Sequence, residues 1–465
     1  MGISTAAQCE AFQARRAHRG TPGAGQGAAA AGQQNAAGKQ PLEPVTKLPP
    51  GVTNGQLAPL LDSAKQRQIG GGRTPPSGKP AATAPQAPPP SNDQAAQAKL
   101  QVRKAPPLPP PAATPTAGTA PTTRIQLPQN VTVVNETVVN NTTVNNTTVN
   151  ENAGPGRPGR RGGAGGMPGA FPTPPGAREV NPIGLAIGAV LQLGDRLIVD
   201  SSGRDQYRMS GGGRDHTDYA ELPGNRYQET IYRPGGVRIV TIYDRDGDIL
   251  RRSRFDRDGR ETVLAYFDYR DDRSLGQWQD PGADLPPLQL DVNVNNYVLD
   301  ASQADEGSLQ RFLGQPPVEP VPRLYSIDEV ERSARLRDIM PRIELTDLTF
   351  DTGSATLAND QVQELGGVAD AMLALLQRNP AETFLIEGHT DAVGSPASNL
   401  VLSDARAAAV AQILTDVYHV PPENLATQGY GSEFLRIQTA DAERLNRRVV
   451  IRRITPLVTI AQSDN

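Results

Sequence analysis

The chain is poor in cysteine and in aromatic residues. Cys9 is the single cysteine among 465 residues, which excludes an intramolecular disulfide framework and a zinc site built on cysteines. Phe, Trp and Tyr number 8, 1 and 11, and only Phe12 and Phe171 precede Tyr207. A long stretch without aromatic side chains buries too little apolar area to offset the conformational entropy lost on folding. The chain is therefore not one globular unit throughout.

Long hydrophobic runs are also absent. No stretch reaches roughly 18 consecutive apolar residues, so the sequence predicts no transmembrane helix. Residues 1–20 lack the basic segment and the apolar core of a signal peptide. Two interpretations remain, a cytosolic protein or an exported protein whose true translation start lies upstream of Met1. The net charge of −4 gives no general attraction for nucleic acid.

Glycine and proline are abundant instead, at 46 and 43 residues. Residues 1–180 are predicted to be a mostly disordered Pro/Gly/Ala-rich spacer, because such a composition favours an extended, solvated chain. Four pentads follow one another at residues 132–151: TVVNE, TVVNN, TTVNN and TTVNE. They form either a polar low-complexity spacer or a short self-associating β-stalk, since valine and threonine favour strands and stacked asparagines form ladders.

Residues 181–300 are predicted to form a β-rich module of hairpins. Two Asp-Gly pairs, ending at Gly247 and Gly259, lie between β-forming runs. Asp-Gly is a strong hairpin signal because both central positions of a type I′ turn need positive φ. The 12-residue spacing of the pairs fits a β-meander of about six-residue strands over residues 204–275. A calcium loop fits poorly, because arginines stand where an EF-hand needs oxygen ligands.

Three shorter features flank or follow this meander. The apolar run 181–193 is too short to cross a bilayer and is predicted to be a helix or strand buried on the next domain. Residues 288–294 are a further strand candidate. Residues 301–341 are predicted to be a linker and one helix, which starts at the capping box 326–329 and runs to Met340.

Residues 342–456 have the regularity that the rest of the chain lacks, and residues 457–465 are a tail. The pattern predicts an α/β (α+β) sandwich of β-α-β-α-β-(α)-β order, with two helices on one sheet. The second helix is expected to start at Ser395 as the cap, with Pro396 at the first helical position. The predicted elements are strand 343–350, helix 359–376, strand 383–388, helix 395–417, strand 425–430, short helix 440–445 and strand 447–454.

Arg406 stands out on the second of these helices. At about 100° per residue it falls near the centre of an apolar arc formed by Leu402, Val410, Ile413 and Val417. Arginine stays protonated in proteins and is rarely buried without a partner. Either its stem packs while the guanidinium reaches the surface, or a carboxylate from the protein or from a ligand faces it.

The residues around Arg406 resemble a known family. The segment GHTDAVGSPASNLVLSDARAAAV at 388–410, followed by GYG at 429–431 and NRRV at 446–449, is similar to the OmpA-like C-terminal domain family. Phe350-Asp351 and the ATL at 355–357 match the first strand and the start of the first helix of that family. The resemblance covers about 120 residues, from Arg335 to Thr455, roughly a quarter of the chain.

The resemblance implies non-covalent binding of peptidoglycan through the diaminopimelate of its stem peptide. In that family an aspartate and an arginine hold the free end of the diaminopimelate. The resemblance places these two residues at Asp391 and Arg406. Independently of the family, a group with an ammonium and a carboxylate on one carbon needs one anion and one planar bidentate cation. Asn399 and Leu402 match neighbouring positions that shape the pocket. Weaker correspondences are Thr390, Gly394 and, behind the ligand contacts, Arg448.

The remaining motifs point to no enzyme, no metal and no cofactor. His389 is one of four histidines, none of which has metal-ligand spacing, so it is predicted to be structural. The common hydrolase, zinc-protease and nucleotide-binding motifs do not occur. The favoured hypothesis is a non-catalytic envelope protein of a Gram-negative bacterium, periplasmic or associated with the outer membrane, with peptidoglycan as partner and other envelope proteins as partners of the β-rich module. The alternatives are a cell-wall enzyme and a flagellar-stator-like subunit that use the same domain as an anchor.

Overall fold

The computed structural model describes residues 41–45, 47–69, 88–100, 108, 177–179, 189–193, 196–200, 215–224, 226–244, 247–267, 280–350 and 353–461. The predictions for residues 1–40 and for the pentads at 132–151 lie outside these ranges. Among the described residues, no helix is both long and apolar enough to span a membrane.

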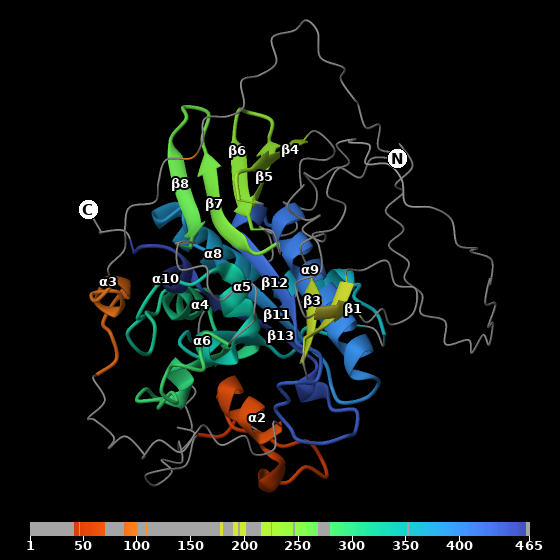
Figure 1. Ribbon diagram of the computed structural model, residues 1–465. Coiled ribbons are helices and arrows are strands. Elements are labelled where there is room, and N and C mark those ends of the chain that lie inside the picture. Colours follow the sequence, from red (N-terminus) through yellow and green to blue (C-terminus); the bar gives the residue numbers. More distant parts are fainter. Residues whose placement is uncertain are drawn as a thin grey trace, which may run out of the picture. The chain divides into compact units, whose positions relative to one another are not determined.

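A five-stranded mixed sheet organises the C-terminal domain, with strand order β12-β11-β13-β10-β9. β11 and β12 are parallel, β13 is antiparallel to both β10 and β11, and β9 is parallel to β10. β11, β12 and β13 run side by side (Figure 1). The strands are β9 (Val298–Asp300), β10 (Arg342–Leu345), β11 (Phe384–His389), β12 (Leu425–Gly429) and β13 (Arg448–Arg453). The predicted α/β sandwich is confirmed, and so is the predicted order of its strands and helices along the chain.

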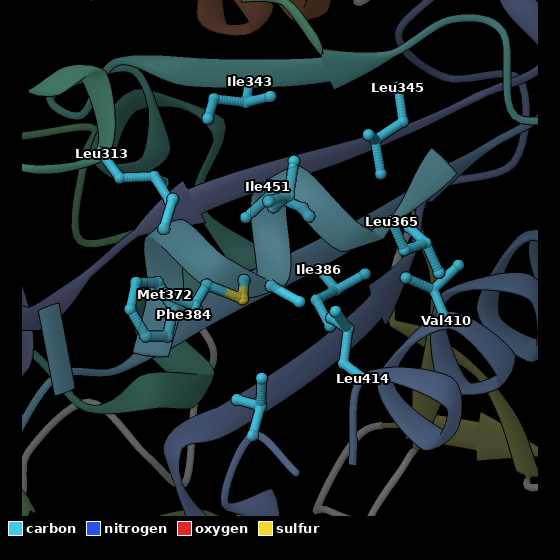
Figure 2. Packing of buried hydrophobic residues seen from close by; sticks show 14 of the residues in the cluster. Leu313, Ile343, Leu345, Leu365, Met372, Phe384, Ile386, Val410, Leu414 and Ile451 are labelled. Atoms are coloured by element: carbon cyan, nitrogen blue, oxygen red, sulfur yellow. The ribbon is translucent and has the colours of Figure 1, made fainter. Parts of the chain in front are cut away.

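Helices cover one face of this sheet and form the main core with it. Strand alternation points Ile343, Ile386 and Ile451 to this face, where they pack with Met372 and Leu414 from the helices (Figure 2). The helices whose residues contribute to this core are α4 (Glu306–Leu313), α8 (Gly366–Arg378) and α9 (Pro396–Asp416), and α7 (Asn359–Glu364) precedes α8.

The start of α9 agrees with the prediction, and its buried face agrees in part, because Val410 lies in the core and Ile413 packs against it. The Ser395 side chain accepts the Ser398 N–H, and Pro396 occupies the first turn. Val417, which was expected in the apolar arc, is 53% exposed. A Cβ on Gly388 would lie 1.9 Å from the Ser403 carbonyl oxygen. A Cβ on Gly429 would likewise lie 2.3 Å from the backbone nitrogen of Asp404. The face of α9 is therefore set by close approach of its backbone to strand glycines, which the hydrophobic pattern does not reveal.

Several predicted boundaries differ from the structure. The helix from the capping box to Met340 is two short helices, α5 (Ile327–Arg332) and α6 (Ala334–Arg337), because Ser333 is extended and caps α6. The capping box itself is present. Residues 288–294 form no strand; Asn293 instead caps the 3₁₀ turn η4 (Val294–Asn296), because its side chain accepts the Asn295 N–H. The helix predicted at 359–376 is divided into α7 and α8. The short helix predicted at 440–445 is the 3₁₀ turn η7 (Arg444–Asn446), and α10 (Thr455–Val458) follows β13.

The other face of the sheet is charged and buried. It is covered by N-terminal segments together with α5, α6 and the residues up to Met340. Arg342, Glu344, Glu387 and Arg452 project from the strands to this polar face, and none is more than 1% exposed. We call residues 41–66 and 88–100, which cover it, the N-terminal strap. The strap includes α3 (Asp93–Ala96) and most of α2 (Asp62–Ile69).

The N-terminal strap supplies countercharges to the polar face. Glu43 pairs with Arg342 at 2.8 Å, and Asp62 pairs with Arg452 at 3.2 Å. Asp93 pairs with Arg453 on β13. These stretches lie within the region predicted to be a spacer and differ from that prediction. Besides the ion pairs, Leu60 and Leu61 hold the strap in place by packing in an apolar cluster with Tyr297.

The β-rich module contains the predicted meander. Its five antiparallel strands lie in chain order β4-β5-β6-β7-β8. They are β4 (His216–Leu222), β5 (Arg226–Tyr232), β6 (Arg238–Tyr243), β7 (Ile249–Phe255) and β8 (Glu261–Tyr266). A separate antiparallel sheet comprises β1 (Ala177–Glu179), β2 (Ala189–Leu193) and β3 (Arg196–Asp200), so the described end of the apolar run 181–193 is a strand.

The Asp-Gly turn after β7 is not of type I′. Gly247 and Gly259 have φ of 92° and 79°, as a turn glycine requires, but Asp258 has no positive φ. The Gly259 N–H donates to the Asp256 carbonyl at 3.0 Å, and the Asp256 carboxylate accepts the Arg260 N–H at 2.8 Å. The loop after β7 is therefore a type I turn followed by a left-handed glycine, a three-residue hairpin connection.

Candidate functional site

The candidate site lies where β11 ends and α9 begins. His389 is the last residue of β11, and a loop from Thr390 to the N-cap Ser395 leads into the helix. Gly394 has φ of 103°, a conformation that favours glycine, so the loop turns there. The first three turns of α9 then present Asn399, Leu402 and Arg406, and the segment after β10 contributes contacts from the other side.

Arg406 is 4% exposed, and its guanidinium is held in place. Its Nε donates to the Ser354 carbonyl at 3.0 Å, and its guanidinium carbon lies 4.9 Å from the centre of the Phe350 ring. Burial and the neighbouring charge of Arg447 lower the pKa of Arg406 to about 10, while Asp391 acts in the opposite direction. Arg406 therefore remains a cation at neutral pH, and its head group does not simply reach into solvent.

Asp391 is buried, and the cation paired with it is Arg447. Its Oδ2 accepts a hydrogen bond from Arg447 Nη1 at 2.7 Å, and its Oδ1 accepts the Val393 N–H at 3.2 Å. Asn399 donates through Nδ2 to the Asp391 carbonyl oxygen at 3.3 Å. The carboxylate is thus oriented by the loop and the helix, and it stands close enough to Arg406 to influence its pKa.

Three further predicted residues accompany this group. The Thr390 N–H donates to the Gly431 carbonyl at 2.9 Å, and its buried Oγ1 has no hydrogen-bond partner among the described residues. A Cβ on Gly394 would lie 3.3 Å from Asn399 Oδ1, so glycine keeps this contact uncrowded. Leu402 is half-buried on the second turn of α9.

Arg448 does not join the site, whereas Arg447 does. Arg448 Nη2 donates to the Phe434 carbonyl at 3.0 Å, and its Nε lies 3.9 Å from Glu344 on the polar face. Neighbouring residues of a strand point to opposite faces, so the two arginines of the NRRV motif separate. Arg447 shares the parity of Val449, which packs in the core on the helix side. The alternation of side chains along the strand is the sequence signal that could have predicted Arg447, rather than Arg448, as a residue of the site.

His389 is a packing residue in this arrangement. Its ring centre lies 5.6 Å from that of Tyr430 and 6.4 Å from that of Phe434. Burial, with the nearby Arg448, lowers its pKa to about 3, so the imidazole is neutral.

The geometry provides one buried carboxylate and one fixed guanidinium at the start of a helix. Such a pair is complementary to a group with an ammonium and a carboxylate on the same carbon.

Comparisons with known proteins identify the domain that holds this site. Residues 349–448 match the OmpA family, so the chain contains an OmpA-like C-terminal domain, as the resemblance implied. Outer membrane porin F of Pseudomonas aeruginosa is 33% identical over 110 residues, which cover 23% of this chain and 30% of that protein. Outer membrane protein Omp38 of Acinetobacter baumannii is 32% identical over 135 residues, which cover 29% and 35%.

Among solved structures, the peptidoglycan-associated lipoprotein from Burkholderia pseudomallei is similar at 25% identity with a TM-score of 0.20. The match covers 23% of this chain and 85% of that one. The chain spans only about a third of the length of the two curated relatives.

Proposed function

We propose that this chain is a non-catalytic envelope protein that binds peptidoglycan non-covalently through the diaminopimelate of the stem peptide. The observation that supports this most strongly is the fixed, buried Arg406 beside the buried carboxylate of Asp391. Asp391 receives the ammonium of the free end of diaminopimelate, and Arg406 receives its carboxylate through a planar pair of N–H donors.

The neighbouring side chains shape this site. Asn399 holds the Asp391 loop against α9, and Leu402 offers an apolar wall to the methylene chain of the ligand. Thr390 lies at the start of this loop, and its hydroxyl is buried without a hydrogen-bond partner among the described residues.

The proposed location is the periplasmic side of the outer membrane of a Gram-negative bacterium. The matched relatives are named as outer membrane proteins, and the matched region is the domain that contains the site. In this proposal the OmpA-like domain anchors the chain to the cell wall, while the β4–β8 meander is available to another envelope protein.

Co-sedimentation of the full chain with purified sacculi tests the proposal. Asp391→Asn and Arg406→Ala each remove one partner of the zwitterion. Loss of one member of a desolvated charge pair costs about 2–5 kcal/mol, so each variant should bind at least ~30-fold more weakly. Sacculi with lysine in place of diaminopimelate lack the second carboxylate and should bind poorly.

Two controls separate binding from folding and from catalysis. Thermal melts of both variants should stay close to that of the unaltered chain if the residues act on the ligand. Undiminished binding by both variants, or equal binding to both kinds of sacculi, would contradict the proposal. Release of soluble muropeptides during the assay would indicate a cell-wall enzyme instead.

A further inference from the structure

We infer that Arg447 is an internal competitor for the ligand: it forms an ion pair with Asp391 in the structure and must be displaced by the ammonium of the ligand. This inference rests on the proposed function of the same site. It assigns Arg447 a role in setting affinity that is distinct from the direct contacts of Asp391 and Arg406.

The ion pair between Asp391 and Arg447 is asymmetric. The Asp391 side chain is 11% exposed, whereas the Arg447 side chain is 40% exposed. Arg447 Nη1 lies 2.7 Å from Asp391 Oδ2. A buried carboxylate without a cation is costly, so Asp391 needs a partner when no ligand is present. A guanidinium that is already part-exposed is hydrated easily once it is released. Arg447 is therefore the member of the pair that can leave.

Arg406 does not replace Arg447 in this exchange, because other contacts hold it. Its Nε is bonded to the Ser354 carbonyl, and its guanidinium lies against the Phe350 ring. The two arginines repel each other, as shown by the lowering of the Arg406 pKa by Arg447. Arg406 thus stays in place to receive the carboxylate.

Charge balance then favours displacement over simple addition. Arg406 and Arg447 both lie close enough to Asp391 for their charges to interact. Addition of the ligand ammonium next to Asp391 would place a third cation there, close to Arg447. Movement of Arg447 into solvent removes this repulsion, so that the ammonium pairs with Asp391 while the carboxylate of the ligand meets Arg406. Binding therefore exchanges one ion pair for another, which lowers the net affinity.

The test measures binding of meso-diaminopimelate to the full chain by calorimetry, with sacculi co-sedimentation as a second readout. Arg447→Gln removes the competing charge and should tighten binding by about threefold, since a part-exposed ion pair contributes only modestly. Arg447→Lys retains a weaker, monodentate competitor and should fall between the unaltered chain and Arg447→Gln.

A nearby arginine provides the matched control. Arg444 forms an exposed ion pair with Asp347 at 3.4 Å, and both side chains are 55% exposed. Arg444→Gln removes the same charge from the same segment and should leave binding unchanged. This control separates local competition at Asp391 from a general effect of net charge.

Each outcome decides between the two hypotheses. Tighter binding by Arg447→Gln, together with loss of binding in Asp391→Asn, supports the inference. Weaker or unchanged binding by Arg447→Gln, while Asp391→Asn and Arg406→Ala still lose binding, overturns the inference and leaves the proposed function standing. If Asp391→Asn and Arg406→Ala also bind normally, the proposed function fails and the inference fails with it.

Discussion

Arg342 on β10 and Glu43 in the N-terminal strap are 299 residues apart in the chain, yet Arg342 Nη2 lies 2.8 Å from both carboxylate oxygens of Glu43. Neither side chain is more than 1% exposed. Arg342 also pairs with Glu344 at 2.9 Å on its own strand. Because a buried guanidinium depends on its countercharges, the strap belongs to the same folded unit as the OmpA-like domain.

Glu43→Gln should lower the free energy of unfolding by about 3 kcal/mol, because it leaves buried charge on Arg342 and Lys65 only partly compensated. Denaturant unfolding of the full chain measures this change. The exposed Asp284→Asn provides a control that removes the same charge and should have little effect. An unfolding midpoint unaffected by Glu43→Gln would show that the strap is not part of the cooperative unit.

The stability of the chain should depend on pH through Asp328. Burial and the nearby carboxylate of Asp248 raise the pKa of Asp328 from 3.8 to about 7, although Arg332 between them acts in the opposite direction. At pH values between 3.8 and about 7, Asp328 is therefore protonated in the folded state and ionised in the unfolded state. The contribution of Asp328 to the free energy of unfolding should fall as pH rises from about 4 to about 7, by at most about 1.4 kcal/mol per pH unit.

Asp328→Asn tests this dependence, because an amide cannot ionise but its oxygen can still accept the Ile249 N–H. The difference in unfolding free energy between Asp328→Asn and the unaltered chain should shift in favour of the variant as pH rises from 4 to 8. The comparison isolates Asp328 from the other buried carboxyl groups, including Glu331, whose pKa is also raised by burial. A constant difference across this range would argue against a raised pKa at Asp328.

Gly259→Val should destabilise the meander by about 1–2 kcal/mol, because a left-handed backbone is unfavourable for a β-branched residue. A Cβ at this position meets no atom within 4 Å, so the effect is conformational rather than steric. Gly259→Asn should cost less, since asparagine tolerates this region. Both variants should bind sacculi normally, and equal stability of the valine variant would contradict the turn geometry.

Gly388→Ala should disturb the contact between β11 and α9 because its Cβ would meet the Ser403 carbonyl at 1.9 Å. Overpacking of this kind costs about 1–3 kcal/mol or more. Since α9 presents Asn399 and Arg406, sacculi binding should weaken along with thermal stability. Gly307→Ala, in the first turn of α4 with its nearest atom at 3.5 Å, provides the tolerant control. Full binding by Gly388→Ala would mean that the helix position is not critical.

Local features of the structure were predictable from the sequence. The cap at Ser395, the capping box at Ser326 and the positive φ of the turn glycine Gly259 each depend on residues within a few positions. The alternation of apolar residues in β10, β11 and β13 likewise depends only on neighbours, which explains why the order of strands and helices along the chain was predicted, whereas the order of strands within the sheet was not. Asp391, Asn399 and Arg406 came from a contiguous motif, and the structure places them around one loop and the start of one helix.

Contacts between distant residues were decided only by the tertiary structure. Glu43 finds Arg342 across 299 residues, and no local pattern encodes that pairing. The buried face of α9 follows from the missing side chains of Gly388 and Gly429 on other elements, and so the apolar arc predicted Val410 correctly but not Val417. The sequence by itself determined which residues form the loop and helix of the site. The choice between Arg447 and Arg448 as the partner of Asp391 required the strand to be placed in the sheet, because only then does its alternation point one arginine toward α9 and the other toward the polar face.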